Sequence, residues 1–157
     1  LVVYFSYSGT SGLVAGVIKE ALAAEDLELK LSDDRERKGL IKYIWGGKMA
    51  VSRSKPSLKP YEAAWENYDL IIIGGPVWAG SLSPALTTFL DETRITGKRI
   101  ALFCCYGGGK GRFFDQLKAL LPGNTFVGEK EFIIPSGSKQ AEALEKVRVW
   151  ARALETL

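Results

Sequence analysis

The chain has 157 residues, of which 46% are hydrophobic and 25% are charged. This is the composition of an ordinary globular protein, and the length predicts a single domain over residues 1–157. No apolar stretch approaches the ~20 residues needed to cross a bilayer, so we expect no membrane-spanning segment. The chain contains no histidine, which excludes imidazole acid–base catalysis and histidine-ligated metal sites. An enzyme of this composition needs a bound cofactor to supply its reactivity.

The formal net charge is +3, and positive charge is concentrated in residues 35–59. Glu36 is the only acidic residue of that segment, which contains Arg35, Arg37, Lys38, Lys42, Lys48, Arg53, Lys55 and Lys59. The segment is either an ordinary solvated surface or an attraction site for an anionic ligand. The only cysteines are the adjacent Cys104 and Cys105, which excludes a disulfide framework and favours a cytoplasmic location. Neighbouring strand residues point to opposite faces, so we expect both thiols to be packing groups.

Runs of apolar residues predict the strands of a parallel sheet. Residues 1–5, 70–73 and 100–105 are continuously apolar, which suits strands that helices cover on both faces. A weaker run lies within residues 126–134, with polar residues between its two apolar pieces. Residues 27–31 alternate apolar and charged side chains, as expected of an edge strand.

The helical spacing of apolar residues between these runs predicts the helices. Their apolar stripes lie within residues 13–22, 40–45, 82–90, 113–121 and 144–154. Alternating strands and helices predict an α/β sandwich, and right-handed crossovers favour a five-stranded parallel sheet in the order 2-1-3-4-5. The irregular residues 46–62 either cover the sheet edge or form the rim of a site.

The loop between the first strand and the first helix is rich in hydroxyl groups. In a sheet of this order, ligands bind beyond the carboxyl ends of the strands, so the loops after strands one, three and four converge. The hydroxyl residues and the glycine of this loop are Ser6, Ser8, Gly9, Thr10 and Ser11. Free backbone N–H groups, the helix dipole and these hydroxyls favour a phosphate, whereas a simple N-cap needs only one such residue.

The loops after the third and fourth strands combine aromatic rings with glycines. The second loop contains Pro76, Val77, Trp78, Ala79 and Gly80. The third contains Tyr106, Gly107, Gly108 and Gly109, followed by Lys110. An aromatic ring on a glycine-rich turn suits a flat ligand, with burial under a neighbouring loop as the alternative. Consecutive glycines allow close approach of the backbone to a ligand, with plain flexibility as the alternative.

The first loop resembles the phosphate loop of the flavodoxin family, Thr/Ser-x-Thr/Ser-Gly-Asn-Thr. Ser6, Ser8 and Gly9 match this pattern, Ser11 conservatively replaces the Thr, and Thr10 stands where the family usually has Asn. Residues 76–80 are similar to the second flavin loop of small flavodoxin-family oxidoreductases. The resemblance covers the whole chain and implies a short flavodoxin-like three-layer α/β/α sandwich.

The resemblance also implies that the cofactor is FMN, with its 5′-phosphate in the first loop. It implies that Trp78 and Tyr106 lie near the isoalloxazine ring, with backbone N–H groups of residues 107–109 at the pyrimidine edge. Lys110 then either lies near N1 of the ring or faces solvent. Flavodoxins that act as carriers are usually strongly acidic, so the basic charge of this chain shifts the expectation toward a reductase-like function.

Three functions are compatible with these residues. The leading one is an FMN-binding electron-transfer protein with a redox partner protein. The alternative is an NAD(P)H-dependent FMN oxidoreductase that reduces quinones or other small acceptors, with residues 35–59 attracting the nicotinamide phosphates. The third is a flavodoxin-fold binding module without a cofactor. We expect a monomer or homodimer with no nucleic-acid or membrane partner.

Overall fold

The computed structural model describes residues 1–32 and 55–156. The helix predicted within residues 40–45 lies outside the described residues. So do most of the basic segment and the first part of the irregular stretch 46–62. Residues 55–64 form no regular element. An isolated antiparallel bridge joins Leu58 to Leu31, which follows β2, and Tyr61 packs against Phe89 of the core.

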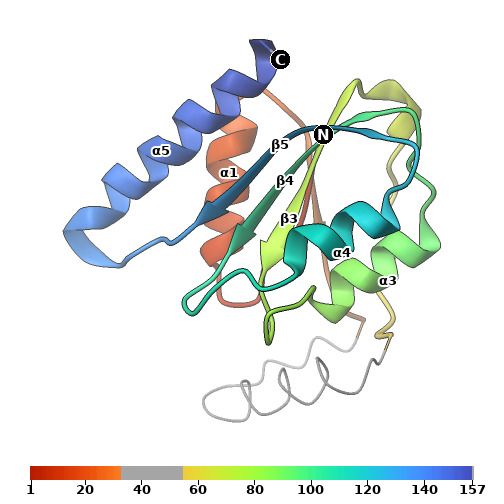
Figure 1. The fold of residues 1–157 in the computed structure, drawn as a ribbon, viewed down its shortest axis with the longest axis horizontal. Helices are drawn as coiled ribbons and strands as arrows, with labels where there is room; N and C mark the ends of the chain where they lie inside the picture. Colours follow the sequence, from red (N-terminus) through yellow and green to blue (C-terminus); the bar gives the residue numbers. More distant parts are fainter. Residues whose placement is uncertain (33–54, 157) are drawn as a thin grey trace.

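Five parallel strands form one sheet in the order β2-β1-β3-β4-β5, which confirms the predicted topology (Figure 1). The strands are β1 Val2–Phe5, β2 Asp26–Leu29, β3 Leu70–Pro76, β4 Arg99–Cys105 and β5 Thr125–Phe132. β1 pairs with β2 on one side and with β3 on the other, so the chain changes direction along the sheet between β1 and β3. The loops that follow these strands lie at this switch point.

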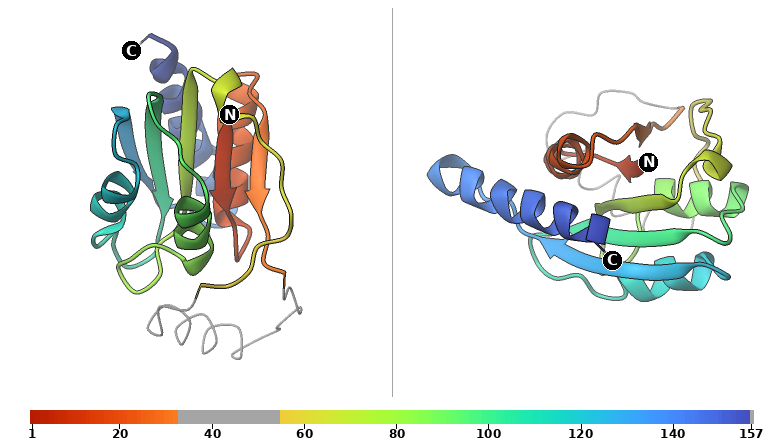
Figure 2. Two further views of the ribbon diagram at one scale, coloured as in Figure 1. Left: turned by 90° about the vertical axis from the view of Figure 1, so that its right-hand side faces the viewer. Right: turned by 90° about the horizontal axis from the view of Figure 1, so that it is seen from above.

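Helices cover both faces of the sheet, which confirms the predicted three layers (Figures 1 and 2). The described α-helices are α1 Thr10–Ala21, α3 Pro84–Glu92, α4 Phe113–Leu120 and α5 Gln140–Ala153. The helices α1 and α5 lie on one face, and α3 and α4 lie on the other. No helix within the described residues is long and apolar enough to cross a membrane.

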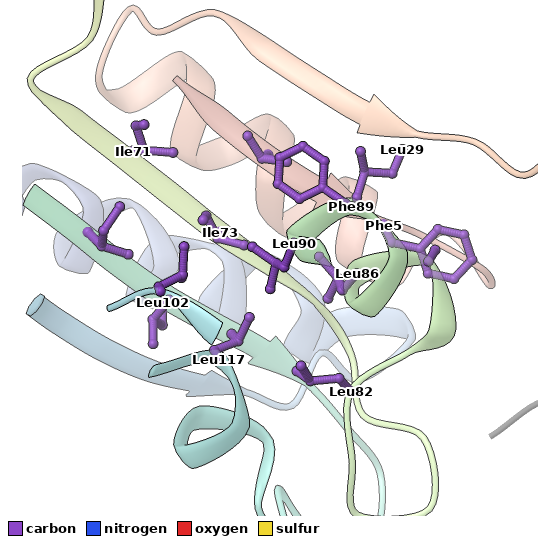
Figure 3. Packing of buried hydrophobic residues seen from close by; sticks show 14 of the residues in the cluster. Phe5, Leu29, Ile71, Ile73, Leu82, Leu86, Phe89, Leu90, Leu102 and Leu117 are labelled. Atoms are coloured by element: carbon purple, nitrogen blue, oxygen red, sulfur yellow. The ribbon is translucent and has the colours of Figure 1, made fainter. Parts of the chain in front are cut away.

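The alternation of side chains along the buried strands divides the core into two clusters. Phe5, Ile73 and Leu102 belong to the cluster under α3 and α4, where Leu86 and Leu117 pack against them (Figure 3). The intervening strand residues belong to the cluster under α1 and α5. Burial of each large apolar side chain contributes about 1.5–3 kcal/mol. The continuous apolar runs in the sequence therefore correspond to strands that are buried on both faces.

The last strand differs from the weak run predicted at 126–134. β5 is one continuous edge strand that includes the polar residues Glu129, Lys130 and Glu131. An edge strand has solvent on one side, so charged side chains are tolerated there and also discourage edge-to-edge pairing. The register shifts opposite Ile100 and Ala101, where Gly128 lies close to Leu154.

Candidate functional site

The carboxyl ends of β1, β3 and β4 bring the three predicted loops together at one edge of the sheet (Figure 1). The first and second loops meet through Tyr7 and Trp78, whose ring centroids are 5.1 Å apart. The second and third loops meet where the backbone N–H of Arg112 donates to the carbonyl oxygen of Gly80 at 2.8 Å. The convergence predicted from the sequence is therefore present.

The first loop leaves the N-terminus of α1 open. Gly9 has φ of 92°, a left-handed conformation, and a Cβ placed there would meet nothing within 4 Å. In the described part of the chain, the backbone N–H groups of Thr10 and Ser11 have no hydrogen-bond acceptor. Such free N–H groups, together with the helix dipole, form a site for an anion.

The hydroxyl groups of this loop do not have equivalent surroundings. Ser6 Oγ accepts a hydrogen bond from the backbone N–H of Gly12 at 3.0 Å, so this side chain stabilises the first turn of the helix. Ser11 is buried, and its side chain lies near the thiol of Cys105, where it lowers the pKa of that thiol and so opposes the effect of burial. Ser8 is exposed and Thr10 is partly exposed, and neither hydroxyl has a partner among residues 1–32 and 55–156. Ser8 and Thr10 are therefore the side chains best placed to donate to a phosphate.

Trp78 lies on a tight turn in the second loop. Its backbone N–H and carbonyl oxygen bond to Ser81 at 3.0 and 2.9 Å, and the two residues between them have positive φ values, 48° at Ala79 and 71° at Gly80. The indole packs edge-on against Tyr7 and also against Phe5, with ring centroids 6.0 Å apart in the second pair. Trp78 is half-buried, so part of it rests on the core and part faces the loops.

The third loop places Tyr106 beside β5. The Tyr106 hydroxyl donates to Glu131 Oε2 at 3.0 Å, and this bond raises the pKa of the phenol. Lys110 Nζ lies 3.8 Å from the same oxygen and 5.7 Å from the centre of the Phe114 ring. Residues 107–109 are exposed, and a Cβ at any of the three would meet nothing within 4 Å. The backbone of this loop is thus accessible to a ligand.

The two cysteines are separated by the sheet, as predicted. Cys104 belongs to the core under α3 and α4, and Cys105 belongs to the core under α1 and α5. Burial raises the pKa of Cys104 to about 12 and that of Cys105 to about 11. Both thiols are therefore protonated packing groups at neutral pH.

Three residues at these loops were not identified from the sequence. Tyr7 occupies the variable position of the first loop, Glu131 is a charged residue of an edge strand, and Gln116 is a polar residue in a helix. Gln116 Oε1 accepts hydrogen bonds from the Ser81 hydroxyl and the Leu82 N–H, at 2.8 and 3.0 Å. Only Glu131 had a sequence signal: it alternates with the apolar Phe132 at the carboxyl end of a predicted strand.

Comparison with known proteins agrees with this architecture. No curated protein is similar enough in sequence to count as a match. A flavoprotein from Lactobacillus acidophilus, solved in complex with FMN, is 22% identical with a TM-score of 0.69, over 90% of this chain and 95% of that chain. A WrbA-like flavodoxin from Agrobacterium tumefaciens is 17% identical with a TM-score of 0.67, over 99% and 93%. These likenesses show the fold.

The class of protein that the fold and the loops define is a flavodoxin-like redox protein. The model of the NADPH-dependent FMN reductase family matches residues 4–139, so the chain belongs to that family. FMN is therefore its cofactor, and the site fits it: the open N-terminus of α1 suits the phosphate, and the exposed backbone of residues 107–109 suits a flat polar ring edge.

Proposed function

We propose that this chain is an NAD(P)H-linked FMN oxidoreductase that passes electrons to a small acceptor. The observation that carries the proposal is the open, uncharged N-terminus of α1 at the switch point, with Trp78 of the second loop beside it. Membership of the NADPH-dependent FMN reductase family favours a nicotinamide donor over the protein donor of a carrier. The net charge of +3 also supports a small acceptor, because the chain lacks the acidic character of carrier flavodoxins.

In this proposal each loop binds one part of FMN. Ser8, Thr10 and the free N–H groups at the start of α1 bind the phosphate. Trp78 and Tyr106 flank the isoalloxazine ring, and the backbone of residues 107–109 binds its pyrimidine edge. The other predicted site residues (Ser6, Gly9, Ser11, Pro76, Val77, Ala79 and Gly80) shape these loops.

When bound, FMN would supply the redox chemistry, namely the capacity to take up a hydride and to pass electrons on singly or in pairs. The protein supplies binding and orientation. Neutral hydroxyl and N–H donors stabilise the phosphate by hydrogen bonding, because the first loop contains no Lys or Arg. The half-buried Trp78 excludes water from one edge of the site, and the exposed third loop leaves a path for a small substrate.

Reduction of the FMN-loaded protein tests this proposal. Under anaerobic conditions, NADPH or NADH should bleach the flavin absorbance, and turnover with a soluble quinone should follow. A protein that binds FMN, is reduced by dithionite and is not reduced by either nicotinamide would instead be an electron carrier. A colourless protein that does not quench the fluorescence of added FMN would be a binding module without a cofactor.

A further inference from the structure

Glu131 contacts two side chains of the third loop at once. Its Oε2 accepts the hydrogen bond of the Tyr106 hydroxyl at 3.0 Å and lies 3.8 Å from Lys110 Nζ. Both partners come from the β4–α4 connection, whereas Glu131 comes from β5. One carboxylate thus joins the loop to the sheet.

The position of Glu131 in the strand directs its side chain toward this loop. Glu131 pairs with Cys104, and the next residue, Phe132, pairs with Cys105 and packs in the core under α1 and α5. Because side chains alternate along a strand, Glu131 points to the α4 side, where Tyr106 also packs. It is one residue from the carboxyl end of the strand, at the edge where the site lies.

The neighbouring carboxylate Glu129 provides a comparison, because its ion pair connects two structural elements and does not involve the third loop. Glu129 projects from the same face of β5, about 7 Å earlier along the strand, and forms an ion pair with Lys118 of α4 at 2.5 Å. That pair joins a helix to the sheet and has no partner in the third loop. Glu131 differs because both of its partners belong to the loop that borders the site.

The end of the third loop is fixed by the hydrogen bond from the Arg112 N–H to Gly80, whereas its first part, residues 106–110, has few contacts with the other described residues. Residues 107–109 are exposed, with open space where side chains would be, and Lys110 is also half-exposed. The backbone N–H of Tyr106 reaches the carbonyl oxygen of Phe132 only at 3.4 Å. In the described part of the chain, the Tyr106 hydroxyl bonds to Glu131, and the Lys110 ammonium lies near both Glu131 and the Phe114 ring. Glu131 therefore contributes to the position of both groups.

We propose that Glu131 is a positioning residue of the flavin site, which orients Tyr106 and neutralises Lys110 and thereby lowers the reduction potential of bound FMN. The inference rests on the proposed placement of the flavin between the second and third loops. Reduction adds negative charge to a flavin, so a nearby carboxylate disfavours the reduced form. By pairing with Lys110, Glu131 also weakens the attraction of that ammonium for the reduced form.

The charge of Glu131 is removed with little change in shape by Glu131→Gln. In this variant we expect the ratio of the affinities for reduced and oxidised FMN to be three- to tenfold higher than in the wild type. A tenfold increase raises the potential by about 30 mV for a two-electron couple. The matched control, Glu129→Gln, removes the same charge from the same face of the strand and should leave the potential unchanged. The potentials are measured against a reference dye during dithionite reduction, without a nicotinamide.

The part played by Lys110 is tested by combining substitutions. Lys110→Gln alone should lower the potential, and Glu131→Gln should raise it less in the Lys110→Gln background than in the wild type. Equal potentials in Glu131→Gln and Glu129→Gln would overturn the proposal. If the potential shifts of Glu131→Gln and Lys110→Gln simply add in the double variant, Glu131 does not act through Lys110. These potentials are measured without a nicotinamide. A failure of NAD(P)H to reduce the protein would therefore contradict the proposed function without affecting the test of Glu131.

The orientation of Tyr106 is read separately in the FMN-free protein. Glu131 raises the pKa of the Tyr106 phenol through their hydrogen bond. The ring carbon signal of Tyr106 in a tyrosine-labelled sample should therefore titrate at lower pH in Glu131→Gln than in Glu129→Gln. Identical titrations would show that Glu131 does not hold Tyr106.

Discussion

Gln116 Oε1 accepts a hydrogen bond from Ser81 Oγ at 2.8 Å, so that helix α4 is bonded to the turn that carries Trp78. The same oxygen accepts the backbone N–H of Leu82 at 3.0 Å. A single side-chain amide thus fixes the end of the second loop. This contact and the hydrogen bond from Arg112 to Gly80 make the second and third loops one structural unit.

The first prediction concerns Gln116. Replacement by Leu keeps a similar volume but removes the acceptor of the Leu82 N–H, and an unsatisfied buried N–H costs about 1–3 kcal/mol. We expect the free energy of unfolding of the FMN-free protein, from urea titration, to fall by that amount. FMN should also bind more weakly because the turn under Trp78 loosens. Gln116→Glu keeps an oxygen acceptor at the position of Oε1 and should behave like the wild type. A Leu variant equal to the Glu variant would contradict the prediction.

The second prediction concerns the contact between Gly80 and Gly111. A Cβ on Gly111 would lie far too close to the Gly80 backbone, including its carbonyl oxygen. Because backbone cannot move aside as a flexible side chain can, Gly111→Ala should separate the two loops and weaken FMN binding more than tenfold, measured by fluorescence quenching.

Gly97→Ala is the matched control for that substitution. Gly97 also has a positive φ, 70°, but a Cβ there would meet nothing within 4 Å. It precedes β4, at the end of the sheet away from the site. Its substitution should cost about 1–2 kcal/mol of stability from backbone strain alone and leave FMN affinity unchanged. Equal FMN affinities in the two variants would show that the loop contact does not support the site.

The arrangement of the layers and the positions of the three loops could be predicted because they depend on local patterns. The continuous apolar runs of β1, β3 and β4 report burial on both faces, and glycines and hydroxyls mark the loops at their carboxyl ends. The strand order then brings these loops together without any further information.

The side-chain partners within the site could not be predicted in the same way. The sequence places Ser11 among the other hydroxyls of the first loop, yet its side chain is buried near Cys105 of a strand far along the chain. Gln116 and Glu131 each contact a loop from a separate element, through pairings that only the packed structure brings into range. Spacing in the sequence reports which face a residue occupies, and it does not report which atom lies opposite.

The third prediction separates phosphate binding from ring binding. Ser8→Ala and Thr10→Ala each remove a hydroxyl donor at the open N-terminus of α1 and should weaken FMN binding by about 1–2 kcal/mol. Riboflavin has the same ring without the phosphate, so its affinity should be unchanged in both variants. Titrations of tryptophan or flavin fluorescence with the two ligands provide the measurement. Equal losses for FMN and riboflavin would place these hydroxyls away from the phosphate.

The last prediction uses the buried thiols. Their pKa values are about 12 for Cys104 and about 11 for Cys105 in the folded protein, against an ordinary value of 9.0. Between pH 9 and pH 11 the unfolded chain therefore releases protons that the folded chain retains, which favours unfolding. Below pH 9 both states keep these protons, and the thiols contribute no pH dependence. Stability should accordingly fall as pH rises above 9, by about 1.4 kcal/mol per pH unit for each thiol.

Urea unfolding at pH 8, 9 and 10 measures this loss in the FMN-free protein. The double variant Cys104→Ala/Cys105→Ala serves as the control, because it retains the buried Tyr4, whose pKa is also raised, to about 12. Its free energy of unfolding should be lower at pH 8, since packing is lost, but should decline less steeply with pH than that of the wild type. The slope isolates the thiols from the packing defect, which lowers stability equally at each pH. Parallel declines in the two proteins would mean that the thiols ionise in the folded state as readily as in the unfolded chain.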